Sequence, residues 1–428
     1  MLKTADPTPT AAVPAGHVMR AYRETFECAV VDAAFLWLRR VYAVDAPHYT
    51  RSDLAELEQR LDAQLDILMS SPDLGWSACE AALELQQPGE AFTAAVVALR
   101  SHDIGKIQTV IQSGLAAPDT FPGLVSAFGW LPGEIARPWV ERLLKGKDMN
   151  HKYLGVAAAS VRREDPGEIL TDILKREDCR QHAPLHARAL RLVGELRRQD
   201  LMPALQQNLS AKDPVIFFWA SWSGILLGQQ ALVTNLRAQV LKPGPLQVRA
   251  IQLAFRVLPV EQGREWISAL AQDPANGRAV ITATGILGDP HAVNWLIAKM
   301  TEPKFARLAG ESFSFITGIE LEKHELVQLP APVQAPVPND DPEDQDAGLD
   351  EDENLPWPDA EKIAALWRKH GQHFLVGRRY FLGKAIVPDW LRNRLQEGTQ
   401  RQSHAAALEL ALIDTQSRLV NTRTRVGA

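Results

Sequence analysis

The chain has 428 residues, more than one hydrophobic core usually serves, so several domains or one extended repeat array are expected. Its 46% apolar and 23% charged residues are typical of a folded protein. The net charge of -6 argues against a general nucleic-acid binder, which would carry a basic excess. Its three cysteines form no CxxC pair, which argues against a disulfide framework.

The N-terminal residues 1–18 are rich in Pro, Thr and Ala and lack the apolar core of a secretory signal. We expect them to be disordered. No run of 18 apolar residues occurs that could span a membrane. These features and the unpaired cysteines favour a cytoplasmic setting.

Residues 19–77 are expected to form a helical hairpin that caps the N-terminal end. Its first helix should run near 19–44 and stop at Ala46-Pro47, since proline removes a backbone donor and restricts the residue before it. Its second helix carries one apolar face, with leucines at steps of three and four: Leu54, Leu57, Leu61, Leu65 and Leu68.

From 78 to 324, short helical stretches alternate with Gly, Pro or Asp breaks. In the clearest unit, 279–299, a helix rich in small residues ends at Gly288, and Asp289-Pro290 starts the next helix. The last apolar residue of each first helix recurs every 29 to 35 residues: Leu99, Leu131, Val161, Leu196, Leu227, Leu258 and Leu287. This spacing predicts an all-α, HEAT-like helical-repeat solenoid.

Residues 325–360 form an acidic, proline-rich segment without Lys or Arg. Such a composition predicts a disordered insertion, either a solvated linker or an arm that contacts a basic partner or the chain's own C-terminal region. The following region, 361–428, is basic, with twelve Lys and Arg against four acids in 362–428, and is expected to form two or three further helices.

Three linked stretches carry a resemblance to a known family: Phe35-Leu36-Trp37-Leu38 leading to Ala46-Pro47-His48-Tyr49-Thr50, Trp219-Ala220-Ser221-Trp222, and Gly377-Arg378-Arg379-Tyr380 leading to Asp389-Trp390-Leu391. Together they resemble the bacterial HEAT-repeat family whose genes often lie beside type VI secretion genes. The resemblance covers about residues 20 to 412 and implies a secretion accessory protein: an effector chaperone, an adaptor or an immunity protein. It implies no catalytic residues.

The aromatic run around Trp219 and Trp222 is the most unusual local feature. It packs in the core between repeats, or one of the two indoles emerges on the concave face. Trp and Arg are favoured anchors of binding patches. Arg188, Arg191 and Arg249 belong to first helices of neighbouring repeats and could line the same groove, so we consider these five residues the candidate binding site.

Cys179, His182 and His186 form a C-x2-H-x3-H pattern that could hold a metal. Pro184 should begin a helix among them, and no fourth ligand stands near, so no metal site is predicted. His370 and His373 are better suited to a loop or capping role. The sequence has no GxGxxG, GxxxxGK[ST] or HExxH motif, so no cofactor and no catalytic residues are predicted.

The sequence therefore favours a non-catalytic scaffold that binds another protein, such as a secretion effector, a toxin or a spike component. As a chaperone or adaptor it would hold an effector before export, and as an immunity protein it would block a toxin. A lyase-like enzyme of the HEAT-repeat class is a third alternative. Neither nucleic acid nor membrane is an expected partner, and the oligomeric state is not predicted.

Overall fold

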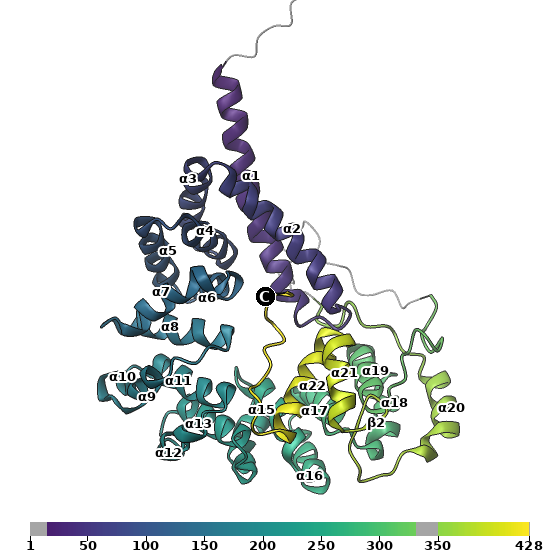
Figure 1. Cartoon of the computed structure of the whole chain (residues 1–428). Helices are drawn as coiled ribbons and strands as arrows, with labels where there is room; N and C mark the ends of the chain where they lie inside the picture. Colours follow the sequence, from purple (N-terminus) through teal and green to yellow (C-terminus); the bar gives the residue numbers. More distant parts are fainter. Residues whose placement is uncertain (1–14, 331–349, 428) are drawn as a thin grey trace, which may run out of the picture. The chain divides into compact units, whose positions relative to one another are not determined.

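The computed structural model describes residues 15–330 and 350–427, with the side chains of 22–330 and 350–427 (Figure 1). These residues are mainly α-helical, and the all-α class predicted from the sequence is confirmed. The chain divides into two compact units, and one boundary between them falls between Leu143 and Leu144. Within the described ranges, every helix is too short or too polar to cross a membrane.

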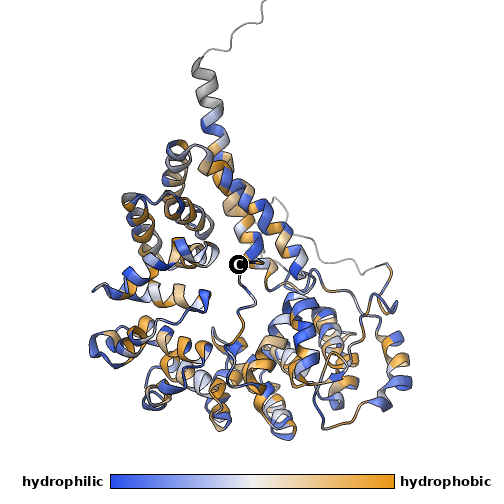
Figure 2. Ribbon diagram, viewed as in Figure 1, coloured by the Kyte–Doolittle hydropathy of each residue, from blue (hydrophilic) through white to orange (hydrophobic). Residues whose placement is uncertain are grey.

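The first unit holds the residues up to Ala43, Ser52–Leu143 and the residues from Thr424 onward. The leucine stripe predicted for its second helix is buried. In Figure 2, hydrophobic and hydrophilic residues alternate along α1 and α2. The helices of this part of the chain are α1 (Ala15–Ala43), α2 (Arg51–Ser70), α3 (Pro72–Ala82), η1 (Leu83–Leu85), α4 (Pro88–Ser101), α5 (Ile104–Ala116), α6 (Phe121–Trp130) and α7 (Gly133–Lys145).

The second unit holds Val44–Arg51 and Leu144–Arg423. Its first part consists of short helix pairs in chain order: α8 (Met149–Arg162), α9 (Glu168–Lys175), α10 (Glu177–Gln181), α11 (Ala183–Leu196), η2 (Gln199–Leu201), α12 (Met202–Gln207), α13 (Pro214–Leu226), η3 (Gln230–Leu236), α14 (Arg237–Leu241), α15 (Gln247–Val257), α16 (Val260–Leu270), η4 (Pro274–Asn276), α17 (Gly277–Leu287), η5 (Pro290–Ala292), α18 (Val293–Lys299) and α19 (Pro303–Thr317).

The first helices of successive pairs pack on one another within this unit. Helix α11 packs between α8 and α13, and α17 packs between α15 and α19. The turn η3 packs on both α13 and α15 and connects the two groups. Helix α13 begins with Pro214, and the Asp213 carboxylate before it accepts hydrogen bonds from the backbone amides of Val215 and Ile216. The predicted Asp289 start is also present, and the Asp289 carboxylate accepts from the His291 amide.

Two of these helix contacts share one close-packed arrangement. Gly194 of α11 faces Ser223 of α13, whose hydroxyl donates to the Leu190 carbonyl over 2.7 Å. Further along the chain, Gly285 of α17 faces Ser312 of α19 in the same way. The Ser312 hydroxyl donates over 3.2 Å to the main-chain carbonyl of Ile281, four residues before Gly285. The glycine lets the helices approach, and the serine bonds the main chain of its neighbour.

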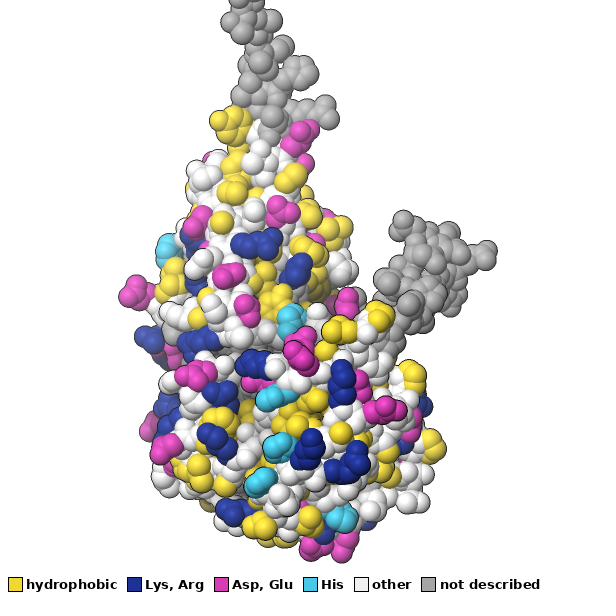
Figure 3. All heavy atoms as spheres, turned by 90° about the vertical axis from the view of Figure 1, so that its right-hand side faces the viewer, with side chains coloured by type: hydrophobic (Ala, Val, Ile, Leu, Met, Phe, Trp, Pro, Cys, Tyr) yellow, Lys and Arg dark blue, Asp and Glu magenta, His cyan; other side chains and the backbone are white. Residues whose placement is uncertain are grey.

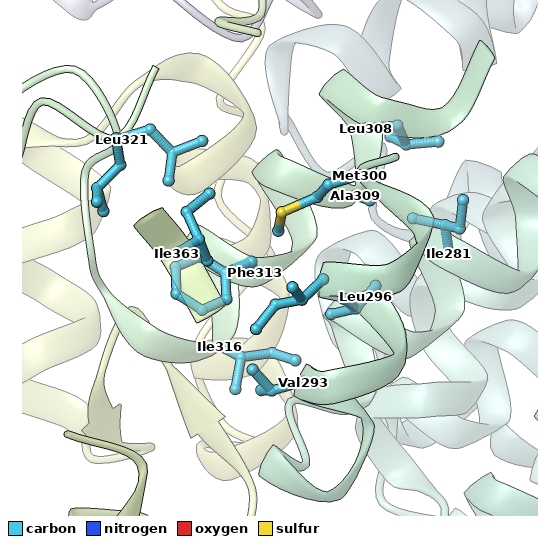
Figure 4. Packing of buried hydrophobic residues seen from close by; sticks show 12 residues of the cluster. Ile281, Val293, Leu296, Met300, Leu308, Ala309, Phe313, Ile316, Leu321 and Ile363 are labelled. Carbon is cyan, nitrogen blue, oxygen red and sulfur yellow. The ribbon is translucent and has the colours of Figure 1, made fainter. Parts of the chain in front are cut away.

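The C-terminal part of the second unit closes on α17 to α19. Its elements are α20 (Ala360–His370), η6 (Gly371–His373), β1 (Tyr380–Phe381), β2 (Lys384–Ala385), α21 (Pro388–Glu397) and α22 (Gln400–Ile413). Strands β1 and β2 form an antiparallel pair that the sequence did not predict. Ile363 of α20 enters a buried cluster with Leu296 of α18 and Phe313 of α19 (Figure 4).

Both described flanks of the acidic segment pack against the repeat helices. The main-chain amide of Gln328 donates a hydrogen bond to the Trp357 carbonyl over 2.9 Å and so joins the two flanks. Asp352 is buried and pairs with Arg278 of α17, and Asp350 pairs with Arg307 of α19. The disordered insertion was predicted over 325–360, but 325–330 and 350–360 have a defined structure, and residues 331–349 lie outside the described ones. Asp350 and Asp352 contact α17 and α19, whereas Asp359 pairs with Lys362 of the C-terminal region over 3.4 Å.

The Gly194 contact makes a stability prediction. A Cβ at Gly194 would lie 2.6 Å from the Ser223 hydroxyl and 2.7 Å from its Cα, so Gly194→Ala must push α11 and α13 apart. We expect the free energy of unfolding to fall by about 1–3 kcal/mol. The matched control is Gly244→Ala, where a Cβ would meet no atom within 4 Å. Urea unfolding of both variants measures this difference, and equal stability would contradict the packing.

Candidate functional site

The centre of the candidate site is the Glu195 carboxylate, in the last turn of α11. Its side chain is 1% exposed. Arg191, one turn earlier, donates from Nε over 2.8 Å, and the Nη1 of Arg163 lies 3.2 Å away. The Ser160 hydroxyl of α8 also donates to it. Residues from two neighbouring helix pairs therefore satisfy one buried carboxylate.

The charges around Glu195 keep it ionised. Burial alone would raise the pKa of this carboxyl group, but the positive charges of Arg191, Arg163 and Arg188 outweigh that effect. The net result is a pKa of about 2. Glu195 is thus a fixed negative charge at neutral pH.

The indole of Trp219, in α13, supports two arginine side chains. The guanidinium carbon of Arg191 lies 4.8 Å from the ring centroid, and that of Arg249, from α15, lies 5.9 Å from it. Trp222 packs edge-on against the same ring at a centroid distance of 5.3 Å. Trp219 and Trp222 are each only 8% exposed. The idea that an indole emerges as a free anchor is therefore wrong, and both rings are core residues, with Trp219 supporting the arginines.

Arg188, on α11, has an unused donor. Part of its side chain reaches solvent, yet its Nε is enclosed and has no hydrogen-bond partner among the described residues. Burial, together with the charge of Arg191, lowers the pKa of Arg188 to about 9. The Arg188 guanidinium remains protonated at neutral pH, so its buried Nε–H is a charged donor without a hydrogen-bond partner among the described residues.

Arg249 has no ion pair within the described ranges. Partial burial and the positive charge of Arg191 lower its pKa to about 10, so it too stays charged. We call Arg163, Arg188, Arg191 and Arg249 the arginine cluster. These four cations surround the single buried Glu195, so the cluster has a surplus of positive charge.

Next to the cluster, residues 414–423 cross the ends of the first helices as an extended segment, which we call the C-terminal strap. The Leu419 amide donates to the Glu195 main-chain carbonyl over 3.1 Å, and the Leu419 carbonyl accepts from the Nε of Arg163 over 2.9 Å. The carbonyl of Ser417 accepts from the Nε of Arg197 over 3.0 Å. Thr415 lies beside Gly228, which follows α13.

The arginines that hold the strap stand at equivalent positions in the helix pairs. Arg163 follows α8 and Arg197 follows α11, and each has a left-handed backbone, with φ of 54° and 61°. Each guanidinium binds main-chain oxygen of the strap. The helix ends therefore recognise an extended polypeptide mainly through its backbone.

The three residues of the C-x2-H-x3-H pattern have separate partners. The Cys179 sulfur lies 3.9 Å from that of Met149. His182 caps α11 by accepting from the Leu185 amide over 3.2 Å. The buried His186 ring nitrogen Nε2 lies 2.9 Å from Oδ1 of Asn208. Among the described residues, no group of three or more His, Cys, Asp and Glu could hold a metal ion.

The structure brings all five predicted site residues into one neighbourhood, but sequence reasoning missed Glu195, Arg163 and the strap. Glu195 follows Arg191 by four residues, a spacing that places both on one helix face and could have revealed the pair. No sequence pattern singled out Arg163. Its contacts with the strap span more than 250 residues, and no local pattern encodes them.

No protein-family model matches the sequence, and neither curated proteins nor solved structures gave a match.

This geometry suits electrostatic capture of an anion. Guanidinium groups bind carboxylates and phosphates through paired donors, and a rigid aromatic support reduces the entropy lost when they are ordered. The buried acid holds Arg163 and Arg191, while the enclosed Nε of Arg188 has no hydrogen-bond partner among the described residues.

Glu195→Gln should remove the negative charge that the arginine cluster surrounds. Because the variant leaves Arg163 and Arg191 facing a neutral amide, we expect a loss of about 3–5 kcal/mol in the free energy of unfolding at pH 7. Glu265→Gln, an exposed acid of α16, is the control and should change stability by less than about 0.5 kcal/mol.

The pH dependence follows from the sign of the Glu195 shift. Its folded pKa of about 2 lies below the ordinary value of 4.5, so its contribution is fully present above the ordinary value and is lost as the pH falls toward 2. Urea unfolding between pH 2 and 7 should show wild type and Glu195→Gln converging at low pH. A constant difference would contradict the assignment.

Proposed function

We propose that this chain is a non-catalytic protein-binding scaffold whose arginine cluster takes up an acidic segment of another protein. The observation that carries the proposal is the buried, unpaired Nε of Arg188 within a cluster of surplus positive charge. A buried charged donor without a partner costs free energy, which an incoming carboxylate would recover.

The strap supports a polypeptide as the ligand. Its main chain is held by the ends of α8 and α11, directly beside the arginine cluster. An acidic segment of a partner lying alongside could use the same kind of backbone contact and place its carboxylates on Arg188 and Arg249. The succession of packed first helices fits the HEAT-like solenoid that we propose as the architecture.

The resemblance to the type VI-associated family extends this proposal to an effector chaperone or adaptor. A cationic face fits an acidic effector. An immunity protein could offer the acidic segment to a basic toxin, yet Asp350 and Asp352 of that segment already pair with arginines of this chain. Rescue of growth from a co-encoded toxin would favour the immunity role, and co-purification of an effector without rescue would favour the adaptor.

Arg249 allows a direct test because it is exposed and its removal breaks no ion pair. We expect fluorescein-labelled octaglutamate to bind the full chain, with the affinity falling as salt rises. Arg249→Ala should weaken binding about tenfold, and Arg249→Glu should weaken it further. Fluorescence anisotropy measures both.

The control is Arg237→Ala, an exposed arginine of α14 outside the cluster, which should bind like wild type. Equal weakening by Arg237→Ala and Arg249→Ala would show that the peptide responds only to general charge. That result, or no binding by wild type, would overturn the proposal.

A further inference from the structure

Helix α1 of the first unit carries an apolar stripe on its exposed side. Its side chains remain largely exposed: Val31 63%, Phe35 56%, Leu38 44% and Tyr42 38%. Cys28 extends the stripe by one turn and is also exposed. The other side of the helix, including Val30 and Trp37, is buried, and α1 packs there on α3 and α4. In Figure 3, hydrophobic side chains reach the surface among charged ones below the grey N-terminal residues.

The stripe has the spacing of a coiled-coil seam. Positions 28, 31, 35, 38 and 42 are separated by alternating steps of three and four residues, which is the heptad pattern of two helices that pack side by side. A seam of this kind is complementary to another helix of the same spacing. Contiguous exposed apolar side chains on a folded protein mark an interaction surface.

The charges beside the seam decide between partners and orientations. Asp32 and Arg39 flank the stripe on one side and are both exposed, and the Arg39 guanidinium lies 6.0 Å from the Phe35 ring centroid. When two copies of α1 pack antiparallel with Phe35 opposite Leu38, Asp32 of each copy faces Arg39 of the other. A parallel pair would instead place Glu27 beside Asp32 of the other copy, which is repulsive.

We propose that two copies of this chain associate through an antiparallel pairing of α1. Phe35 of each copy packs on Leu38 of the second copy, Val31 packs on Tyr42, and the two Asp32–Arg39 pairs set the register. The sequence of the seam is complementary to itself in this orientation, so a second copy is the occupant it fits best. The inference concerns the first unit and is independent of the arginine cluster.

Sedimentation equilibrium of the full chain tests the pairing. Wild type should be a dimer at micromolar concentration, and Phe35→Glu should be a monomer with unchanged helical content. Leu85→Glu, which replaces a 60% exposed leucine of η1 outside the seam, is the matched control and should remain a dimer. A monomeric wild type, or a Leu85→Glu variant that dissociates equally, would overturn the proposal.

A charge swap tests the orientation. Asp32→Arg places two arginines opposite each other at both symmetric positions and should weaken the dimer about tenfold. The double variant Asp32→Arg/Arg39→Asp restores opposite charges and should recover wild-type dimerisation. Failure of the double variant to recover would contradict the antiparallel register.

Cys28 provides a second measurement of orientation. In the antiparallel register the two Cys28 sulfurs lie about 25 Å apart along the seam, so mild oxidation should leave them unlinked. A parallel pair, or another helix pairing that brings the two residues together, would give a Cys28–Cys28 disulfide on a non-reducing gel. Formation of that disulfide in the native dimer would overturn the proposed pairing.

Discussion

A buried carboxylate needs positive charge and hydrogen-bond donors nearby, and the residues around Glu195 supply both. Arg191 approaches it from the same helix, while Ser160 and Arg163 approach from the preceding helix pair. The main-chain carbonyl of Glu195 also accepts a hydrogen bond from the main-chain amide of Leu419. One residue thus connects two helix pairs and the C-terminal strap, and its ion pairs with Arg191 and Arg163 depend on the carboxylate staying ionised.

The same constraint explains why this face is cationic. A single Glu195 cannot balance four arginines, and Trp219 holds Arg191 and Arg249 without supplying a formal charge. Packing therefore places Arg163, Arg188 and Arg191 near the buried acid, while Arg249 is exposed and lies over the Trp219 ring. This is the kind of preorganised site that loses little entropy when it binds an anion. The strap adds an observed mode of backbone recognition on the neighbouring helix ends.

Local patterns predicted the parts of the fold that local physics controls. The leucine stripe of α2, the helix end at Gly288 and the all-α class all follow from spacing and helix-end chemistry. The site was predicted in part, because Arg191 and Arg249 lie over the Trp219 ring and Arg188 lies near Arg191. The sequence could not show that both indoles are buried, nor that Asp352 and Asp350 of the acidic segment pair with Arg278 and Arg307. Those outcomes depend on contacts between residues far apart in the chain.

Capture of an acidic segment requires that the N–H donors of the arginine cluster are free to bind an anion. Arginine side-chain Nε–Hε NMR signals of the full chain, followed while octaglutamate is added, test this claim directly. We predict that the signals of Arg188, Arg191 and Arg249 shift together and saturate at one peptide concentration, while that of Arg237 stays in place. Unmoved cluster signals, with shifts spread over exposed arginines elsewhere, would contradict the account.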